Sequence, residues 1–284
     1  MKTTDLYEEI TSKIIIEVEN GALPWVKEWS SFSGMPENAV TGRGYNGINT
    51  LILWILGTEL GYTSNRWCTF NQAKKSGASI RKGSKSLPVL FFKPLEIDER
   101  DSETGEKITI PMAKIYRVFN EDQVKGLTNE IVNSIDLIDS VDLFIKGTGV
   151  KIVPGSPAFV PSMNWIHMPP VKTFNTTAGY YATIFHEMIH WAGGKTRLNR
   201  DMSGRFGSEG YAMEELVAEI GSAFLCALFK IDGEVRHSGY IENWLKVLKS
   251  DNKAILNAAA EANKAVTYLL ELTEDNELDA VKKV

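Results

Sequence analysis

The chain has few of the features that stabilise small secreted proteins or anchor a protein in a bilayer. It contains two cysteines, Cys68 and Cys226, and neither belongs to a C-x-x-C pair. This argues against a disulfide framework and against a cysteine-rich zinc site. Apolar runs such as 51–56 are far too short to cross a bilayer, and the N-terminus lacks the apolar core of a signal peptide. We therefore expect a cytoplasmic protein with no membrane segment.

The composition is that of a globular protein. Hydrophobic residues make up 43% of the 284 residues and charged residues 24%, which is enough apolar material for one large domain or two ordinary ones. The net charge of −5 argues against a uniformly basic nucleic-acid-binding protein. The net charge of the whole chain does not exclude a local basic patch.

Two histidines four positions apart carry the strongest chemical signal. His186, Glu187 and His190 form the pattern H-E-x-x-H, which places both imidazoles on one face of a helix, where they can bind the same ion. Glu187 follows the first histidine and can act as the general base of a metal-assisted hydrolysis. We expect one Zn²⁺ per chain, with Mn²⁺ or another divalent ion as an alternative. The competing interpretation is an amphipathic helix with a chance match to the motif.

A catalytic zinc site normally has a third protein ligand, and a second predicted helix, 213–229, supplies carboxylates. Glu215 and Glu219 lie four residues apart on one face of it. Burying an unpaired carboxylate is costly, so a nearby cation would explain both. We assign Glu215 as the third ligand and Glu219 as an acceptor that orients a ligand histidine. The alternatives are Glu214 as the ligand, or a solvated acidic helix face.

H-E-x-x-H followed by E-x-x-A-E resembles the gluzincin branch of zinc metallopeptidases, with Glu219 where aspartate is commoner. A metzincin is excluded, because Thr196 stands where the third histidine of that branch would be. The implied reaction is amide hydrolysis, which needs a further donor for the oxyanion. The sequence leaves four candidates for that donor: Tyr180, Tyr181, Arg197 and Tyr211.

The stretch 43–93 differs from the rest of the chain in charge. It has eight basic residues and one acidic residue, a net charge of +7, interleaved with seven aromatic residues. Cations that follow phosphates and rings that stack on unpaired bases are typical of single-stranded nucleic acid binding, where stacking contributes about 1–3 kcal/mol per base. The alternative is an aromatic core beneath a solvated charged surface, and composition alone favours that alternative.

Ordered motifs along most of the chain resemble those of the ArdC antirestriction family. Those in the first half include Thr41-Gly42-Arg43-Gly44-Tyr45-Asn46-Gly47, Trp67-x-Thr69-Phe70-x-Gln72-Ala73 and Ile80-x-Lys82-Gly83. Those in the second half include His186-Glu187-x-x-His190-Trp191, Arg197-Leu198-x-Arg200 and Tyr211-Ala212-x-Glu214-Glu215-Leu216-x-Ala218-Glu219. Asn164 departs from the pattern, because an acidic residue is expected there.

The resemblance implies a sequence-independent single-stranded DNA-binding domain joined to a metallopeptidase-like domain. It also implies carriage on a plasmid, phage or other mobile element, and protection of incoming DNA from host restriction. The protein substrate is not implied; a DNA-associated protein is the candidate that tethering to DNA favours. The basic and aromatic pattern and the matched motifs together give the expected DNA-binding residues: Arg43, Tyr45, Asn46, Trp67, Phe70, Gln72, Lys74, Arg81, Lys82 and Lys85.

We predict an α+β fold of two domains, with 1–128 binding single-stranded DNA and 129–284 forming a zincin-like, gluzincin-type metallopeptidase domain. Apolar periodicity predicts the main helices at 6–20, 131–145, 213–229 and 240–270, strands at 87–92, 108–119, 150–153, 158–160 and 165–168, and a charged tail at 274–284. Two functions remain open at this point. One is a DNA-tethered zinc metallopeptidase, and the other is a non-catalytic protein that coats single-stranded DNA and has a structural zinc site.

Overall fold

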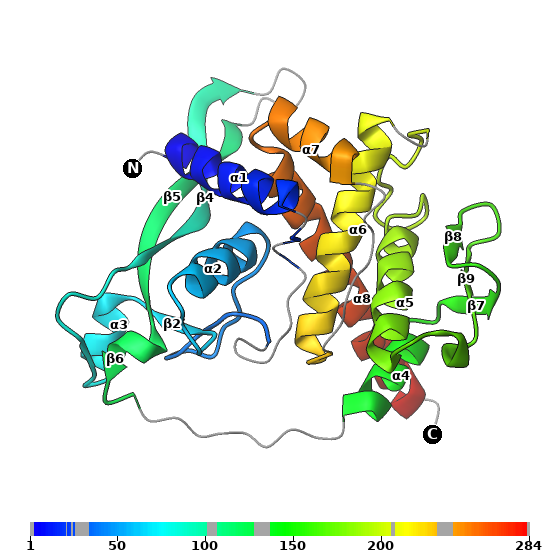
Figure 1. Ribbon diagram of the computed structural model, residues 1–284, viewed down its shortest axis with the longest axis horizontal. Helices are drawn as coiled ribbons and strands as arrows, with labels where there is room; N and C mark the ends of the chain where they lie inside the picture. The colour runs from blue at the N-terminus through cyan, green and yellow to red at the C-terminus, as the bar shows by residue number, and fades with distance from the viewer. Residues whose placement is uncertain are drawn as a thin grey trace.

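The computed structural model describes residues 3–20, 22–23, 25, 34–100, 107–127, 137–205, 208–231 and 241–282. The fold is mixed α+β, as the sequence predicts. A long β ribbon, β4 with β5, lies at one end of the molecule and a small sheet, β7 to β9, lies at the other, with the main helices between them (Figure 1).

The N-terminal half is built around a four-stranded sheet. Its elements are α1 (Thr3–Glu19), β1 (Glu37–Asn38), α2 (Ile48–Glu59), β2 (Arg66–Cys68), α3 (Phe70–Lys75), β3 (Ser79–Ile80), β4 (Leu87–Arg100), β5 (Lys107–Asn120), η1 (Glu121–Gln123) and β6 (Val124–Lys125). The sheet has the order β1-β2-β5-β4, and β3 pairs with β6. Pro88 lies near the start of β4, an edge strand, where the missing N–H removes no ladder hydrogen bond.

The predicted first helix is confirmed, including the face that it buries. Leu6, Ile10, Ile14 and Val18 recur at helical spacing and are all buried. They pack α1 against the rest of the fold, including α7. Local periodicity therefore predicts both the element and its orientation.

The C-terminal half places a three-stranded sheet beside a group of helices. Its elements are α4 (Leu137–Gly147), β7 (Lys151–Pro154), β8 (Ala158–Val160), β9 (Trp165–Met168), η2 (Val171–Thr173), α5 (Thr177–Ala192), α6 (Glu209–Leu228), α7 (Ile241–Ser250) and α8 (Ala254–Lys282). The sheet order is β7-β9-β8, with β7 parallel and β8 antiparallel to the central strand. The strand β8 is thus an edge strand, and it lies against α5.

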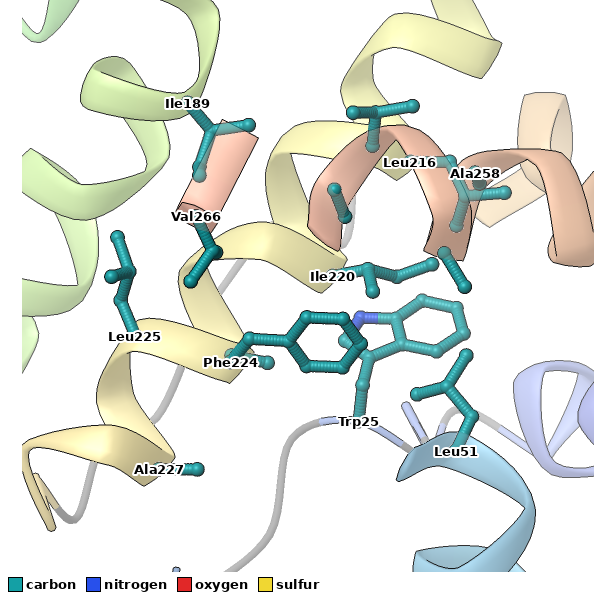
Figure 2. Packing of buried hydrophobic residues seen from close by; sticks show 14 of the residues in the cluster. Trp25, Leu51, Ile189, Leu216, Ile220, Phe224, Leu225, Ala227, Ala258 and Val266 are labelled. Atoms are coloured by element: carbon teal, nitrogen blue, oxygen red, sulfur yellow. The ribbon is translucent and has the colours of Figure 1, made fainter. Parts of the chain in front are cut away.

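One hydrophobic core joins the two halves. Figure 2 shows Leu51 of α2 close to Trp25, with Phe224 of α6 and Ala258 of α8 in the same cluster. The ring of Trp54 on α2 meets Phe224 edge-on at 5.8 Å between centroids. Because these contacts bury apolar surface from both halves at once, the helices of one half are held in place by the other.

The last helix is longer than the sequence predicts. The charged segment 274–284 was expected to be a tail, but α8 continues through Lys282. The predicted boundary between 128 and 129 lies outside the described residues and stays a prediction. Both cysteines are free and buried, in line with the absence of a disulfide framework. None of the described helices is both long enough and apolar enough to span a membrane.

Candidate metal centre and nucleic-acid surface

The metal motif is carried by two helices that are fixed in register. Thr176 caps α5 by accepting a hydrogen bond from the Gly179 N–H, and Ser208 caps α6 by accepting one from the Tyr211 N–H. The buried hydroxyl of Ser222 on α6 donates to the carbonyl of Ala182 on α5 at 2.8 Å. The inner face of α6 is therefore aligned with the face of α5 that carries the H-E-x-x-H motif.

Close approach of these helices depends on Gly221. A Cβ added there would lie 2.7 Å from both Cδ1 and Cγ1 of Ile189, whose side chain is fully buried and β-branched. We expect Gly221→Ala to destabilise the protein by about 1–3 kcal/mol, although alanine normally favours a helix. Denaturant unfolding measures this change. The matched control is Gly210→Ala, where a Cβ would make only an ordinary van der Waals contact, 4.0 Å from the Gly204 Cα, and the change should be neutral or stabilising by up to about 1 kcal/mol.

Three ligand atoms converge between these helices. His186 Nε2 and His190 Nε2 lie 3.1 Å apart, and the Glu215 carboxylate oxygens lie 3.4 Å from the first nitrogen and 3.7 Å from the second. The nearest ligand atoms of the three residues all fall within 4.8 Å of one another. Two nitrogens that each bind a tetrahedral zinc ion at about 2.0 Å are separated by roughly 3.3 Å. The triad that the sequence predicts, His186, His190 and Glu215, is confirmed as a metal-binding group.

The other ring nitrogen of each histidine faces a different carboxylate. His186 Nδ1 lies 3.2 Å from Glu219 Oε1, and His190 Nδ1 lies 3.0 Å from Glu214 Oε1. With a proton on each Nδ1, the Nε2 lone pairs point at a common position, which is the usual arrangement of metal-binding histidines. Glu214 thus lies behind His190 and not beside the Nε2 atoms, so the alternative that made it the third ligand does not fit. The orienting role of Glu219 stays a prediction with compatible geometry.

An arginine fixes the Glu214 carboxylate. Arg200 donates from Nε and Nη2 to the two Glu214 oxygens at 2.9 and 2.7 Å, and Nη2 also donates to the Ile189 carbonyl near the end of α5. A Cβ at Gly193 would overlap this guanidinium, so glycine is needed at that position. The sequence matched Arg200 to a family motif without giving it a role. The structure places it in a chain from Arg200 through Glu214 to His190.

Glu187 lies in a cleft beside the triad. One of its oxygens, Oε2, accepts a hydrogen bond of 2.6 Å from the backbone N–H of Phe159 on β8. The cleft has a volume of about 530 Å³ and is walled by the 157–161 segment on one side and the start of α6 on the other. The histidines, Glu187 and Glu215 all line it. The predicted general base is therefore next to the metal ligands and open to the same space.

The charges of the cluster favour a cation at its centre. Burial opposes protonation of His186, but the Glu215 and Glu219 carboxylates outweigh burial and raise its pKa to about 10. Burial likewise opposes ionisation of Glu215, but hydrogen bonding to His186 and the charges of both histidines outweigh it and lower its pKa to about 2. The donor set of two imidazoles and one carboxylate, with carboxylates behind both imidazoles, fits a divalent transition-metal ion.

The four candidates for the oxyanion donor are placed differently. The Tyr181 hydroxyl is committed to Asp142 at 2.9 Å. The Arg197 guanidinium stacks on the ring of Trp191, 4.0 Å from its centroid, and donates to the Trp191 carbonyl. Of the four, only Tyr211 lines the cleft, where it hydrogen-bonds Glu215. Geometry therefore favours Tyr211.

Asn164, the departure from the family pattern, has a structural explanation. Its φ of 56° lies in the left-handed region, which asparagine adopts more readily than most residues. Its side-chain oxygen accepts a hydrogen bond of 2.7 Å from Arg197 Nη1. An aspartate could accept the same bond, so the departure preserves the contact with Arg197.

The predicted DNA-binding residues separate into three groups. Arg43, Tyr45, Asn46 and Gln72 line one groove, but the Tyr45 side chain is buried, with 8% of its surface exposed. A second group is exposed to solvent but does not line the groove: Phe70, Lys74, Arg81, Lys82 and Lys85. The third group is Trp67 alone.

Trp67 does not belong to the predicted DNA-binding surface. Its side chain is fully buried in the core (0% exposed), because β2 is an inner strand of the four-stranded sheet. It cannot stack on a base in this structure. Arg66, counted in the +7 charge, is paired with Glu37 and Glu121 at 3.0 and 3.1 Å, so the stretch carries less free positive charge than its composition indicates.

Two known protein families match different parts of the chain. Residues 4–119 match the N-terminal domain of anti-restriction factor ArdC, and residues 139–261 match a zincin-like metallopeptidase.

Known proteins resemble the chain over most of its length. Protein y4eC of Sinorhizobium fredii, itself uncharacterised, is 35% identical over 98% of this chain and 96% of its own length. DNA primase TraC of Escherichia coli is 33% identical over 93% of this chain, which aligns with only 27% of the primase. The crystal structure of the antirestriction protein ArdC from plasmid R388, metal-free, superposes with a TM-score of 0.80 at 39% identity, over 95% of this chain and 98% of that one. The Mn(II)-bound structure of the same protein gives a TM-score of 0.77 at 38% identity, over 94% and 98% of the two chains.

Proposed function

Since the chain belongs to the ArdC family of antirestriction proteins, we propose that it is a zinc-dependent metallopeptidase that binds single-stranded DNA and protects DNA entering a host cell. The observation that carries the proposal is the convergence of His186, His190 and Glu215 on one point, with Glu187 open to the same cleft. The N-terminal half supplies the DNA-binding surface.

Each residue of the cleft has a defined part in the proposed reaction. His186, His190 and Glu215 bind the ion, and Glu219 and Glu214 orient the two histidines. A bound divalent ion acts as a Lewis acid toward a carbonyl and a water molecule. Glu187 takes a proton from the attacking water and delivers it to the leaving amine. Tyr211 donates to the oxyanion.

The edge strand β8 aligns the substrate. Its outer side has no partner strand among the described residues, and it runs along one wall of the cleft. An extended peptide can add to such an edge through main-chain hydrogen bonds, although the Phe159 N–H of β8 is bonded to Glu187 in this structure. This mode of binding brings a scissile amide past Glu187 without requiring a particular side-chain sequence.

The DNA-binding surface includes the loop between β3 and β4. The Arg81 N–H donates to the Gln123 carbonyl, and the Gln123 side chain donates to the Lys85 carbonyl. The loop backbone is thus fixed to η1, while the side chains of Arg81, Lys82 and Lys85 are exposed. A rigid loop that presents three cations suits contact with phosphates.

Salt dependence tests the DNA-binding part. We expect affinity for a labelled single-stranded oligonucleotide to fall linearly on a log–log plot as salt rises, with a slope of about −0.7 per neutralised phosphate. The triple variant with alanine at Arg81, Lys82 and Lys85 should lower the steepness of that slope by about two. Fluorescence anisotropy at several NaCl concentrations measures both.

The matched control removes three exposed lysines of the C-terminal half, Lys172, Lys195 and Lys246. It has the same change in net charge and should leave the slope as it is. Equal slopes for the two triple variants would remove the basic loop from the proposed surface.

A further inference from the structure

A groove between the two halves of the chain is separate from the metal cleft. It has a volume of about 1000 Å³ and shares no lining residue with the cleft. One side is formed by the 38–49 turn, Gln72 and the 90–92 segment of β4, and the other by residues 256–264 of α8. Its volume is at the upper end of the range of about 300–1,000 Å³ for small-molecule sites, which leaves room for a nucleotide and its flanking phosphate.

Unused side-chain amides face this groove from both sides. Asn46 comes from the 38–49 turn, and Asn257 and Asn263 come from α8. Among the residues that the structure describes, none of these three side chains makes a hydrogen bond, whereas Asn49 in the same groove is bonded to both backbone groups of Leu90 at 2.7 Å. Amides of this kind offer a donor and an acceptor together, which is what the edge of a base requires.

Aromatic rings and cations complete the lining. Phe91 and Phe92 are 46% and 52% exposed, unusually open for large apolar side chains, and the ring of Phe91 is held edge-on by Tyr116 at 5.1 Å. Arg43 lies on one side, and Lys264 on the other, where it pairs with Glu261 at 2.5 Å. Exposed rings beside cations are the features with which proteins bind unpaired bases and their phosphates.

The contribution of α8 follows from its sequence and packing. Asn257, Ala260 and Lys264 recur at helical spacing on its exposed stripe, and the small side chain of Ala260 leaves the middle of the groove open. The opposite face of α8 is in the shared core, where Figure 2 shows Ala258. A Cβ at Gly47 would lie 3.8 Å from the Ala259 carbonyl, so the turn and the helix are in direct contact. The two sides of the groove are therefore held at a fixed separation.

We propose that this groove binds a nucleotide of single-stranded DNA between the two halves, and that Asn257 and Asn263 of α8 contact its base. The inference rests on the proposed function and adds to it a DNA contact made by the metallopeptidase half. Phe91 or Phe92 stacks on the base, and Arg43 and Lys264 neutralise the flanking phosphates. DNA binding then depends on a helix outside the N-terminal domain.

Two changes on α8 test the proposal by anisotropy with a labelled single-stranded oligonucleotide and the full chain. Ala260→Trp fills the groove and should weaken binding by about tenfold, as expected for the loss of roughly one stacked base. The control is Thr267→Trp, at an exposed position on the same helix that does not line the groove, and it should bind as the parent does.

The second variant combines Asn257→Ala with Asn263→Ala. It should also bind about tenfold more weakly, as expected for the loss of hydrogen bonds to one base, but with the salt slope of the parent, since no charge is lost. Circular dichroism and metal content establish that each variant is folded. If both variants bind the oligonucleotide as tightly as the parent does, the proposal that the groove binds DNA is wrong, and the proposed function still stands. A parent chain that does not bind the oligonucleotide would contradict the proposed function itself.

Discussion

Glu215→Ala is expected to abolish stoichiometric binding of a divalent ion. Even the loss of residues that only orient a ligand costs about 10–100-fold in metal affinity, and Glu215 is itself one of the three convergent ligands. Glu214 and Glu219 cannot replace it where they stand, because they face the Nδ1 atoms of the two histidines and not the Nε2 atoms. Titration with Zn²⁺ and Mn²⁺, followed by metal analysis after dialysis, measures the loss.

The control for this variant is Glu209→Ala. Glu209 is an exposed carboxylate in the first turn of the same helix and does not face the histidines. It should retain one ion per chain. Retention of the ion by Glu215→Ala would contradict the assignment of Glu215 as the third ligand.

Glu187→Gln is expected to lower the rate of peptide-bond cleavage by about 10²–10⁴-fold, the usual contribution of a general base. The substitution is nearly isosteric, and the glutamine oxygen can still accept the hydrogen bond from the Phe159 N–H. The fold and the metal content should therefore be unchanged. Cleavage of an unfolded test protein, followed by mass spectrometry, gives the rate.

A second probe makes this experiment more informative. The same assay with a protein bound to single-stranded DNA tests whether tethering raises the rate, since binding both to one strand increases their effective concentration. Cleavage by Glu187→Gln at the parent rate would contradict the catalytic assignment, whatever the substrate.

The metal centre could be predicted from the sequence because the information for it is local. The spacing of His186 and His190 fixes their common helix face, and the spacing of Glu215 and Glu219 fixes another. Buried carboxylates need a partner, which indicated that the two faces meet. The parts that were missed involve long-range contacts. The pairing of Arg200 with Glu214 and the N–H of Phe159 on Glu187 depend on how a loop and an edge strand approach the helices.

The DNA surface was predicted less well because composition does not distinguish a buried ring from an exposed one. Trp67 and Phe70 are three residues apart in one motif, yet the first is in the core and the second is 56% exposed. A central strand buries its large side chains on the packed face, and strand order could not be deduced from the sequence. Charge counting has the same weakness, since Arg66 is paired within the fold.

The groove could not have been found from the sequence. Its two sides come from distant parts of the chain: the turn that contains Asn46 and the helix that contains Asn263. They meet because α2 and α8 share a core, a consequence of tertiary packing that no local pattern encodes (Figure 2). The polar stripe on α8 reads in the sequence as an ordinary solvated helix face.

The most direct test of the whole account is a restriction-protection assay of Glu187→Gln, combined with metal analysis of the same preparation. If the protein protects DNA as a metallopeptidase, this variant should carry one divalent ion per chain, bind single-stranded DNA as the parent does, and no longer protect incoming DNA. Full protection by a metal-loaded Glu187→Gln would contradict the account, and would instead support a protein that coats single-stranded DNA and uses its metal site only for stability.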